Sequence, residues 1–409
     1  MEKKSILFVI PWLPYPLSSG GHQAVYNGIV AVKDNYDVVV IYEKKAGDDE
    51  AEKHFRMNYP DIVLKPITYP TPSFLHKLAS WSHIIIKKIF GERLTHEELI
   101  CNRWVKTILP LRKEMIMHVD KICQERRFDI IQVEMPWFIS LVLSLPKQSK
   151  KVFVHHELGF VCRDLEVQNY QKDVYLESYK AYVDLNEIAL LNMYDKIVTL
   201  SPVDKEKLIR KGVAVPISTS FAIINSISES NFKLCDVFHL TFVGPDSHMP
   251  NLMGVLWFLE NCWEQLKQKA PKMHLSIIGS WNNTHIQEIS SRFKDVEFLG
   301  FVDNLQESLQ GTIMIVPITI GSGVRMKILE ACTIGVPFVS THVGAEGIPV
   351  SNGEDCFLAD TPEAFVESII KLKDIEIQKT FVNNAMRMVQ ETFSLDAFRK
   401  NRIGIYESI

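Results

Sequence analysis

Short apolar runs that are each followed by a turn and a helix recur along this sequence, and this repetition limits the possible folds more than any other feature. The run Ile6–Ile10 is followed by three prolines, by Gly20 and Gly21, and by a helical pattern over 24–32. A second run, Val38–Tyr42, comes next, so the order strand, loop, helix and strand predicts a right-handed βαβ unit. Further predicted strands are Ile130–Val133, Val152–Val154, Ile197–Leu200, Leu240–Val243, His274–Ile278, Val296–Phe298, Ile313–Val316, Pro337–Ser340 and Phe357–Leu358. We therefore predict an α/β fold of two tandem Rossmann-like, doubly wound domains that face a cleft.

The length of the chain fits this division. A chain of 409 residues with 46% hydrophobic content is too long for one core and suits two domains of ordinary size. We expect an N-terminal domain over 1–215, a Ser-rich linker over 216–236 that shows no helical or alternating pattern, and a C-terminal domain over 237–409. The last helix of the chain can cross back to the N-terminal domain.

Charge and cysteine usage exclude several classes of protein. The net charge of −4 does not favour a nucleic-acid partner. Seven scattered cysteines without a C-x-x-C motif indicate a reducing compartment and no structural zinc site. Met1 leads directly into a strand without a signal-peptide pattern, and no apolar run reaches the roughly 18 to 20 residues of a transmembrane helix. The sequence predicts a cytoplasmic protein.

One basic stretch suggests contact with a membrane surface. Residues 74–113 carry eight Lys or Arg and three Asp or Glu, and they include Trp81 and Phe90. Apolar area together with cations is what an interfacial helix needs on anionic lipid. Peripheral attachment at the inner face of the membrane is our hypothesis. Packing of this stretch as a domain helix with a solvated face is the alternative.

The stretch Ile320–Gly335, which reads I-G-S-G-V-R-M-K-I-L-E-A-C-T-I-G, is the most informative for function. It follows the run Ile313–Val316 and starts a helical pattern near Val324, so it predicts a strand, a tight glycine loop and a helix. Gly321 and Gly323 allow the backbone to approach a ligand closely. The first N–H groups of a helix lack intrahelical partners, and such an end attracts anions, above all phosphate.

Charged side chains at this helix start support a ligand. Arg325 and Lys327 place positive charge where the helix dipole is already positive, which costs the helix a few tenths to about 1 kcal/mol for each residue. An anionic ligand would remove that conflict. The carboxylate of Glu330 accepts hydrogen bonds only, which suits a pair of sugar hydroxyls. A solvated helix in which Glu330 pairs with the two cations explains the same residues without a ligand.

Two places in the N-terminal half also point to a site. Gly20 and Gly21 follow the first strand, and doubly wound sheets bind ligands at the carboxyl ends of their strands. His155 and His156 follow the strand Val152–Val154 in the same way, and a neutral imidazole can donate or accept near pH 7. A simple turn and a buried, hydrogen-bonded histidine are the structural alternatives.

Several of these stretches together resemble a known family. They are F-V-G at 242–244, P-N at 250–251, I-I-G at 277–279, F-L-G-F-V-D-N-L at 298–305, V-P-I-T-I-G-S-G-V-R-M-K-I-L-E-A at 316–331, G-V-P-F-V-S-T at 335–341 and G-A-E-G at 344–347. The chain from 240 to 375 resembles the nucleotide-sugar domain of glycosyltransferase family 4, also called glycosyl transferases group 1, which has the GT-B fold. The N-terminal half is similar more loosely, through Gly20-Gly21, the strand at 152–156 and I-V-T-L-S-P at 197–202.

The resemblance implies a retaining, metal-independent glycosyltransferase of hexosyltransferase type. Such an enzyme would move a sugar from a nucleotide diphosphate sugar to a glycan or lipid-linked acceptor, in the synthesis of a bacterial surface polysaccharide. The N-terminal domain would bind the acceptor and the C-terminal domain the nucleotide sugar, with no cofactor and no metal. No D-x-D sequence occurs in the chain, and two side-chain cations could neutralise the diphosphate instead.

The resemblance also assigns roles to residues. Glu330 matches the second Glu of the family's Glu, seven residues, Glu motif, which binds ribose, whereas the first Glu is replaced by Ser322. The stretch after Gly244 lacks the Arg and Lys that the family often has there, so Arg325 and Lys327 would supply the diphosphate charge. His156 matches the N-domain histidine near the donor sugar. The predicted catalytic residues are thus Arg325, Lys327 and His156, and the predicted nucleotide-sugar-binding residues are Gly20, Gly21, Gly244, Ser322, Gly323, Val324 and Glu330.

Two other functions remain open from the sequence. A nucleotide-sugar epimerase of GT-B fold would bind the same donor, and the formation of product sugar without an acceptor would reveal it. A nucleotide-sugar-binding protein that has lost catalysis would fit the serine at position 322. Tight binding of the donor without transfer or hydrolysis would indicate that protein.

Overall fold

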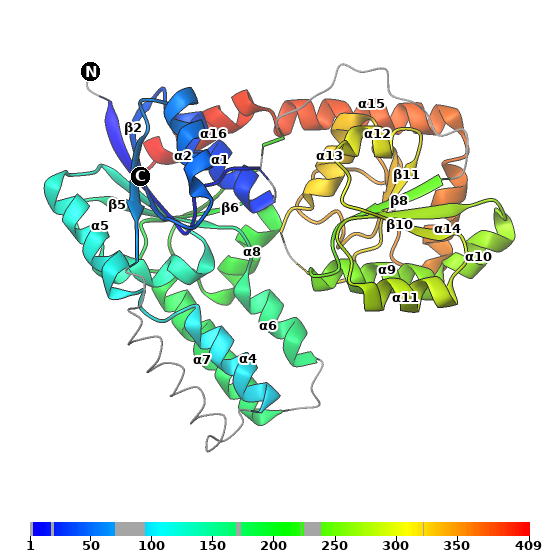
Figure 1. Ribbon diagram of the computed structural model, residues 1–409, viewed down its shortest axis with the longest axis horizontal. Helices are drawn as coiled ribbons and strands as arrows, with labels where there is room; N and C mark the ends of the chain where they lie inside the picture. The colour runs from blue at the N-terminus through cyan, green and yellow to red at the C-terminus, as the bar shows by residue number, and fades with distance from the viewer. Residues whose placement is uncertain are drawn as a thin grey trace. The chain divides into compact units, whose positions relative to one another are not determined.

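The computed structural model describes residues 3–17, 20–69, 95–168, 173–221, 223–224, 239–321 and 323–409, and the chain divides into two compact units (Figure 1). The first unit comprises Met1–Thr199, Lys205–Thr219 and Arg402–Ile409, and the second comprises Leu200–Asp204 and Ser220–Asn401. The last helix, α16 (Leu395–Glu407), therefore contributes residues to both units.

The first unit is built on a parallel sheet with the strand order β3-β2-β1-β4-β5-β6-β7. The strands are β1 (Lys4–Ile10), β2 (Tyr36–Glu43), β3 (Val63–Ile67), β4 (Ile130–Glu134), β5 (Lys150–His155), β6 (Lys196–Thr199) and β7 (Ile217–Thr219). The helices are α1 (Gly20–Val32), α2 (Asp48–Asn58), α4 (His96–Lys106), α5 (Lys113–Glu125), α6 (Gly159–Gln168), α7 (Val174–Leu191) and α8 (Pro202–Lys211), with the 3-10 helix η1 (Pro136–Ser144). The strand order reverses between β1 and β4, and this reversal point is where open α/β sheets bind their ligands.

The second unit repeats the plan with the strand order β10-β9-β8-β11-β12-β13, again with parallel pairs. The strands are β8 (His239–Val243), β9 (His274–Ile278), β10 (Val296–Gly300), β11 (Ile313–Val316), β12 (Phe338–Ser340) and β13 (Phe357–Leu358). The helices are α9 (Met249–Asn261), α10 (Trp263–Lys269), α11 (Asn283–Arg292), α12 (Leu305–Leu309), α13 (Met326–Ile334), α14 (Pro362–Lys371) and α15 (Ile375–Thr392). Here the order reverses between β8 and β11, so the loops that follow these two strands meet at one edge.

Burial explains why the apolar runs become strands. Ile6 to Ile10 and Ile313 to Val316 are completely buried, because a parallel strand in the middle of a sheet is covered by helices on both faces. Each unit has its own apolar core of sheet and helix side chains. The predicted fold class, two Rossmann-like doubly wound domains, is confirmed, and every run predicted as a strand forms one.

Some local expectations differ from the structure. Gly20 and Gly21 were expected in a loop, but they form the first turn of α1. Strand β7 lies inside the range expected to be a linker and pairs with β6. Residues 70–94, which hold most of the basic stretch proposed to touch a membrane, lie outside the described residues. In the part of the chain that the structure describes, no helix is both long and apolar enough to span a bilayer.

Candidate nucleotide-sugar site

The loop between β11 and α13 depends on two glycines with positive φ angles. Gly321 has a φ of 121° and Gly323 a φ of 84°, and residues other than glycine rarely adopt such angles. A Cβ atom on Gly321 would also lie 3.0 Å from Nη2 of Arg325 and 3.3 Å from Cγ of Pro250. The glycines therefore let the backbone turn tightly over the start of α13.

Arg325 stands at the N-cap of α13 and is 7% exposed. Its Nη1 atom donates a hydrogen bond to the carbonyl oxygen of Gly323, so the guanidinium folds back onto the glycine loop. The positive charge is thus held at the helix start, beside the backbone N–H groups of the first turn.

Lys327 is partly buried, and its ammonium group lies beside the loop that follows β8. Its Nζ atom donates a hydrogen bond of 2.8 Å to Oδ1 of Asn251 and lies 4.2 Å from the centre of the Phe242 ring. A Cβ atom on Gly244 would lie 3.0 Å from this Nζ atom and 2.5 Å from Nδ2 of Asn251, so the lysine fits only because residue 244 has no side chain. Among the residues described, no carboxylate lies at ion-pair distance from Lys327.

The electrostatic state of Lys327 follows from this environment. Burial, and then the neighbouring charge of Arg325, lower the pKa of Lys327 to about 7, while Glu330 acts in the opposite direction. Burial also raises the pKa of Glu330, and Lys327 partly offsets that rise. A buried cation beside a second cation is poorly solvated, and an anion at the helix start would stabilise its charged form.

The loop after β8 is fixed by groups that lie far apart in the sequence. Nδ2 of Asn251 donates to the carbonyl of Pro245 at 2.9 Å, and Nε1 of Trp281 donates to the carbonyl of Gly244 at 2.9 Å. Gly279 packs so closely on this loop that a Cβ atom there would lie 2.7 Å from the carbonyl carbon of Gly244. Of these residues, sequence reasoning assigned a role to Gly244 and missed the contribution of Asn251, Phe242 and Trp281.

In the first unit, His156 lies directly after β5 and ends a chain of hydrogen bonds. Its Nε2 atom lies 2.7 Å from Oε2 of Glu134, whose Oε1 accepts a 2.7 Å bond from Nε2 of Gln132. Oε1 of Gln132 accepts a 2.5 Å bond from the hydroxyl of Tyr406 on α16. Because a carboxylate can only accept, Nε2 of His156 donates this bond to Glu134.

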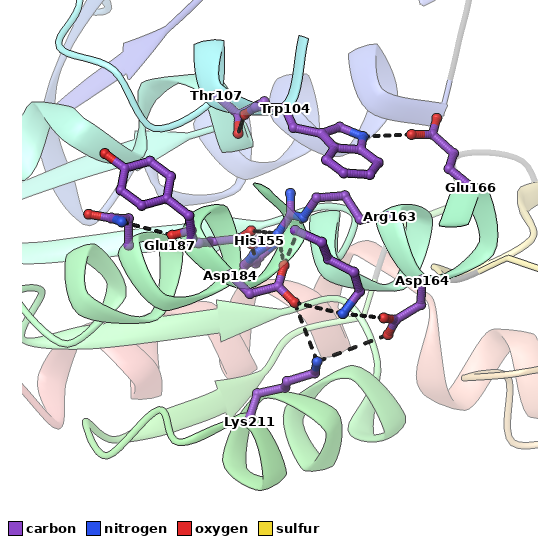
Figure 2. A network of polar contacts seen from close by, with 12 residues as sticks. Trp104, Thr107, His155, Arg163, Asp164, Glu166, Asp184, Glu187 and Lys211 are labelled. Carbon is purple, nitrogen blue, oxygen red and sulfur yellow. Dashed lines mark hydrogen bonds and ion pairs between the residues drawn. The ribbon is translucent and has the colours of Figure 1, made fainter. Parts of the chain in front are cut away.

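His155 has a different environment, a buried network of charged groups (Figure 2). Its Nε2 atom lies 3.4 Å from Oε1 of Glu187, and Glu187 and Asp184 both accept from Arg163. Burial opposes ionisation of Glu187, but the adjacent His155 ring and the charge of Arg163 outweigh it and hold the pKa of Glu187 below its usual value. A Cβ atom on Gly159 would lie 2.8 Å from Nη1 of Arg163, so α6 starts with a glycine to leave room for the pair. This network joins β5 to α6 and α7.

The structure gathers the predicted residues of the second unit in one place. Gly244, Gly323, Val324, Arg325, Lys327 and Glu330 surround the start of α13, at the edge where the strand order reverses. Gly20, Gly21 and His156 lie at the carboxyl edge of the sheet in the other unit. Ser322 is outside the described residues.

Comparison with known proteins agrees with this geometry. Residues 238–374 match the family model described as glycosyl transferases group 1. A Klebsiella pneumoniae protein described as an uncharacterized 44.6 kDa protein in the cps region is 24% identical over 95% of this chain and 96% of its own length.

Solved structures share the fold over the whole chain. TarM, from S. aureus, superposes with a TM-score of 0.71 at 9% identity and covers 99% of both chains. Anabaena HepE in complex with UDP superposes with a TM-score of 0.64 at 13% identity, over 99% of this chain and 100% of its own. Residues 238–374 are thus similar to the glycosyl transferases group 1 family, and the chain as a whole has the GT-B fold.

Proposed function

We propose that this protein is a retaining, metal-independent glycosyltransferase that moves a sugar from a nucleotide diphosphate sugar to a glycan or lipid-linked acceptor. The observation that carries the proposal is the position of the partly buried Lys327 beside the buried Arg325 at the start of α13. Two neighbouring cations with little solvation leave a strong local demand for an anion. A diphosphate supplies that charge.

The same arrangement suits the chemistry of sugar transfer. Negative charge builds on the β-phosphate as the glycosidic bond of the donor breaks, and groups already fixed around that position stabilise the charge without reorganising. Arg325 would offer a planar, bidentate guanidinium and Lys327 a compact charge. Gly323 and Val324 would bring backbone N–H groups toward the phosphates. These groups act as cations and donors without a metal.

Glu330 and His156 would contact the two ends of the donor. Glu330 lies on α13 beyond the two cations and would accept hydrogen bonds from the ribose hydroxyls. In the other unit, the first turn of α1 at Gly20 and Gly21 and the Nδ1 atom of His156 would meet the donor sugar. The first unit would also bind the acceptor.

The biological setting is inferred from relatives. The Klebsiella pneumoniae relative is described by its place in a cps region, and TarM was solved as a mutant with alpha-GlcNAc-glycerol and UDP. These descriptions support a role in the synthesis of a bacterial surface polysaccharide. Location in the cytoplasm, with peripheral attachment to anionic membrane through 74–113, remains a prediction from the sequence.

One screen tests the proposal. Purified protein is incubated with UDP-, GDP-, ADP- and dTDP-sugars, with and without short glycan acceptors, and products are followed by mass spectrometry. The anomeric configuration of any product is then assigned by NMR. We expect slow hydrolysis of one donor class, transfer when an acceptor is added, and retention of the donor's anomeric configuration. Conversion of the sugar without transfer would indicate an epimerase, and donor binding without turnover would indicate a binding protein.

A further inference from the structure

Two tryptophans stack at the point where the strand order of the first unit reverses. Trp12 follows β1 and Trp137 follows β4, and their rings stack with centroids 5.9 Å apart and planes at 29°. Parallel strands end at the same edge, and ligands of open α/β sheets bind at such reversal points. The position and the residue type together point to a binding surface, which we call the Trp12–Trp137 platform.

The exposure of Trp137 does not result from a polar neighbourhood. Apart from two serines, helix η1 consists of apolar residues, and Phe138, Ile139 and Leu141 are buried while Trp137 is 42% exposed. Met135, two residues earlier, has a φ of 78°, which a residue with a long side chain rarely adopts. The turn from β4 into η1 therefore has an unfavourable backbone conformation at Met135. The indole of Trp137, which follows this turn, lies outside the core.

Polar groups border the platform. The His22 ring lies edge-on to Trp12 with centroids 5.4 Å apart, and Nζ of the exposed Lys45 lies 5.7 Å from the centre of the same indole. Burial and the charge of Lys45 lower the pKa of His22, which favours the neutral ring that can both donate and accept. In the described part of the chain, the indole N–H of Trp12 is buried and has no hydrogen-bond acceptor. An unpaired buried donor is unfavourable.

We infer that the Trp12–Trp137 platform binds a sugar ring of the acceptor. One face of a pyranose consists of C–H groups that stack on the electron-rich face of an indole, while its hydroxyls need donors and acceptors around the rim. The platform offers this combination in one place. A lipid chain would need a continuous apolar surface, and the rim of His22 and Lys45 does not provide one. The inference rests on the proposed transfer of a sugar and specifies the acceptor side of it.

The test uses saturation-transfer NMR on the full-length protein, with octyl glucoside below its micelle concentration and with the methyl glycosides of glucose, galactose, mannose, rhamnose and N-acetylglucosamine. We expect ring C–H protons of at least one sugar to be saturated. Trp137→Ala should weaken the affinity about ten-fold or more, as loss of an aromatic anchor does. Trp137→Phe should retain much of the affinity. Tyr182→Ala, which removes another half-exposed aromatic side chain of the same unit, is the matched control.

Three results would overturn the inference. They are no saturation of any sugar by the wild type, saturation that survives Trp137→Ala, and saturation of the octyl chain without the ring. Circular dichroism confirms that each variant is folded. Calorimetry with the nucleotide diphosphate sugars tests the site at α13 and therefore the proposed function by itself. Trp137→Ala and the wild type should bind these donors with the same affinity.

Discussion

Nζ of Lys327 on α13 and Oδ1 of Asn251 on α9 form a 2.8 Å hydrogen bond. The amide orients the ammonium group without neutralising it, and Gly244 leaves the space in which the two side chains meet. The cation is therefore positioned in advance and stays available to an anion, which is the condition for electrostatic stabilisation of a leaving phosphate.

Removal of either cation should slow the reaction. We expect Lys327→Ala and Arg325→Ala each to lower kcat/KM by roughly 10²-fold or more, because each charge would stabilise the departing diphosphate. Initial rates of donor turnover measure the effect. Lys269→Ala, at an exposed lysine of α10, is the control and should be silent. Kinetics close to wild type for both variants would remove the assignment.

A negative charge placed at residue 251 tests whether the positive charge of Lys327 attracts the diphosphate. Asn251→Asp keeps the shape of the side chain but adds a carboxylate that pairs with Lys327 and repels the diphosphate. We expect UDP or the preferred nucleoside diphosphate to bind about ten-fold more weakly in calorimetry. Because the carboxylate cannot donate to the carbonyl of Pro245, thermal unfolding is measured in parallel to confirm that the variant is folded at the temperature of the titration. Binding as tight as in the wild type would show that the phosphates lie elsewhere.

The start of α13 could be predicted from the sequence, whereas the contacts that position Lys327 there could not. Glycines, cations and helical spacing within Ile320–Gly335 are local signals, and the same holds for the apolar runs that became strands. The partner of Lys327 lies 76 residues away, and nothing local shows that its ammonium group is tucked under the loop after β8.

Local patterns also fail at the edges of the sheets. Strand β3 contains Lys65 and Pro66, which argue against a central strand, but it lies at the edge of its sheet, where Pro is tolerated. Strand β7 is three residues long and is formed by pairing with β6 rather than by its own composition. Both were therefore absent from the sequence prediction.

The protonation of Lys327 should make binding depend on pH. Its pKa in the free protein is about 7, below the ordinary 10.5, so above pH 7 the side chain is largely neutral. A bound diphosphate favours the charged form, which raises the pKa, and binding at about pH 8 must then take up close to one proton. Calorimetry of UDP binding in two buffers with different ionisation enthalpies measures this uptake. Lys327→Met should abolish it, and equal uptake in both proteins would contradict the prediction.

The role of Glu330 can be separated from that of the cations by changing the ligand. Glu330→Gln should weaken binding of the nucleoside diphosphate, because a neutral amide accepts weaker hydrogen bonds from ribose hydroxyls. The same loss should be absent when the ligand is the 2′,3′-dideoxy nucleoside diphosphate, which has no hydroxyls to donate. Unchanged affinity with lost turnover would instead make Glu330 a participant in the chemistry.

The hydrogen-bond chain from Tyr406 to His156 gives the last prediction. Tyr406 donates to Gln132, Gln132 donates to Glu134, and Glu134 accepts from Nε2 of His156. Glu134 thus orients the histidine, and α16 supports Glu134 through Gln132. We expect ¹⁵N NMR of the wild type to show a proton on Nε2 of His156. Glu134→Leu should give a mixture of tautomers and lower kcat at least ten-fold, within the range of proton-positioning effects.

Two further variants decide whether Tyr406 acts on His156 through the hydrogen-bond chain or only packs in the first unit. Tyr406→Phe leaves Oε1 of Gln132 without its donor, which should cost about 1–3 kcal/mol of stability and reduce the fraction of the Nε2–H form. The Tyr36 ring packs edge-on against the Tyr406 ring with centroids 5.5 Å apart. Among the described residues, the hydroxyl of Tyr36 takes no part in the hydrogen-bond chain that leads to His156. Tyr36→Phe should therefore change neither the tautomer nor kcat. If Tyr406→Phe and Tyr36→Phe behave alike in the ¹⁵N spectrum, α16 stabilises the first unit by packing and does not orient His156.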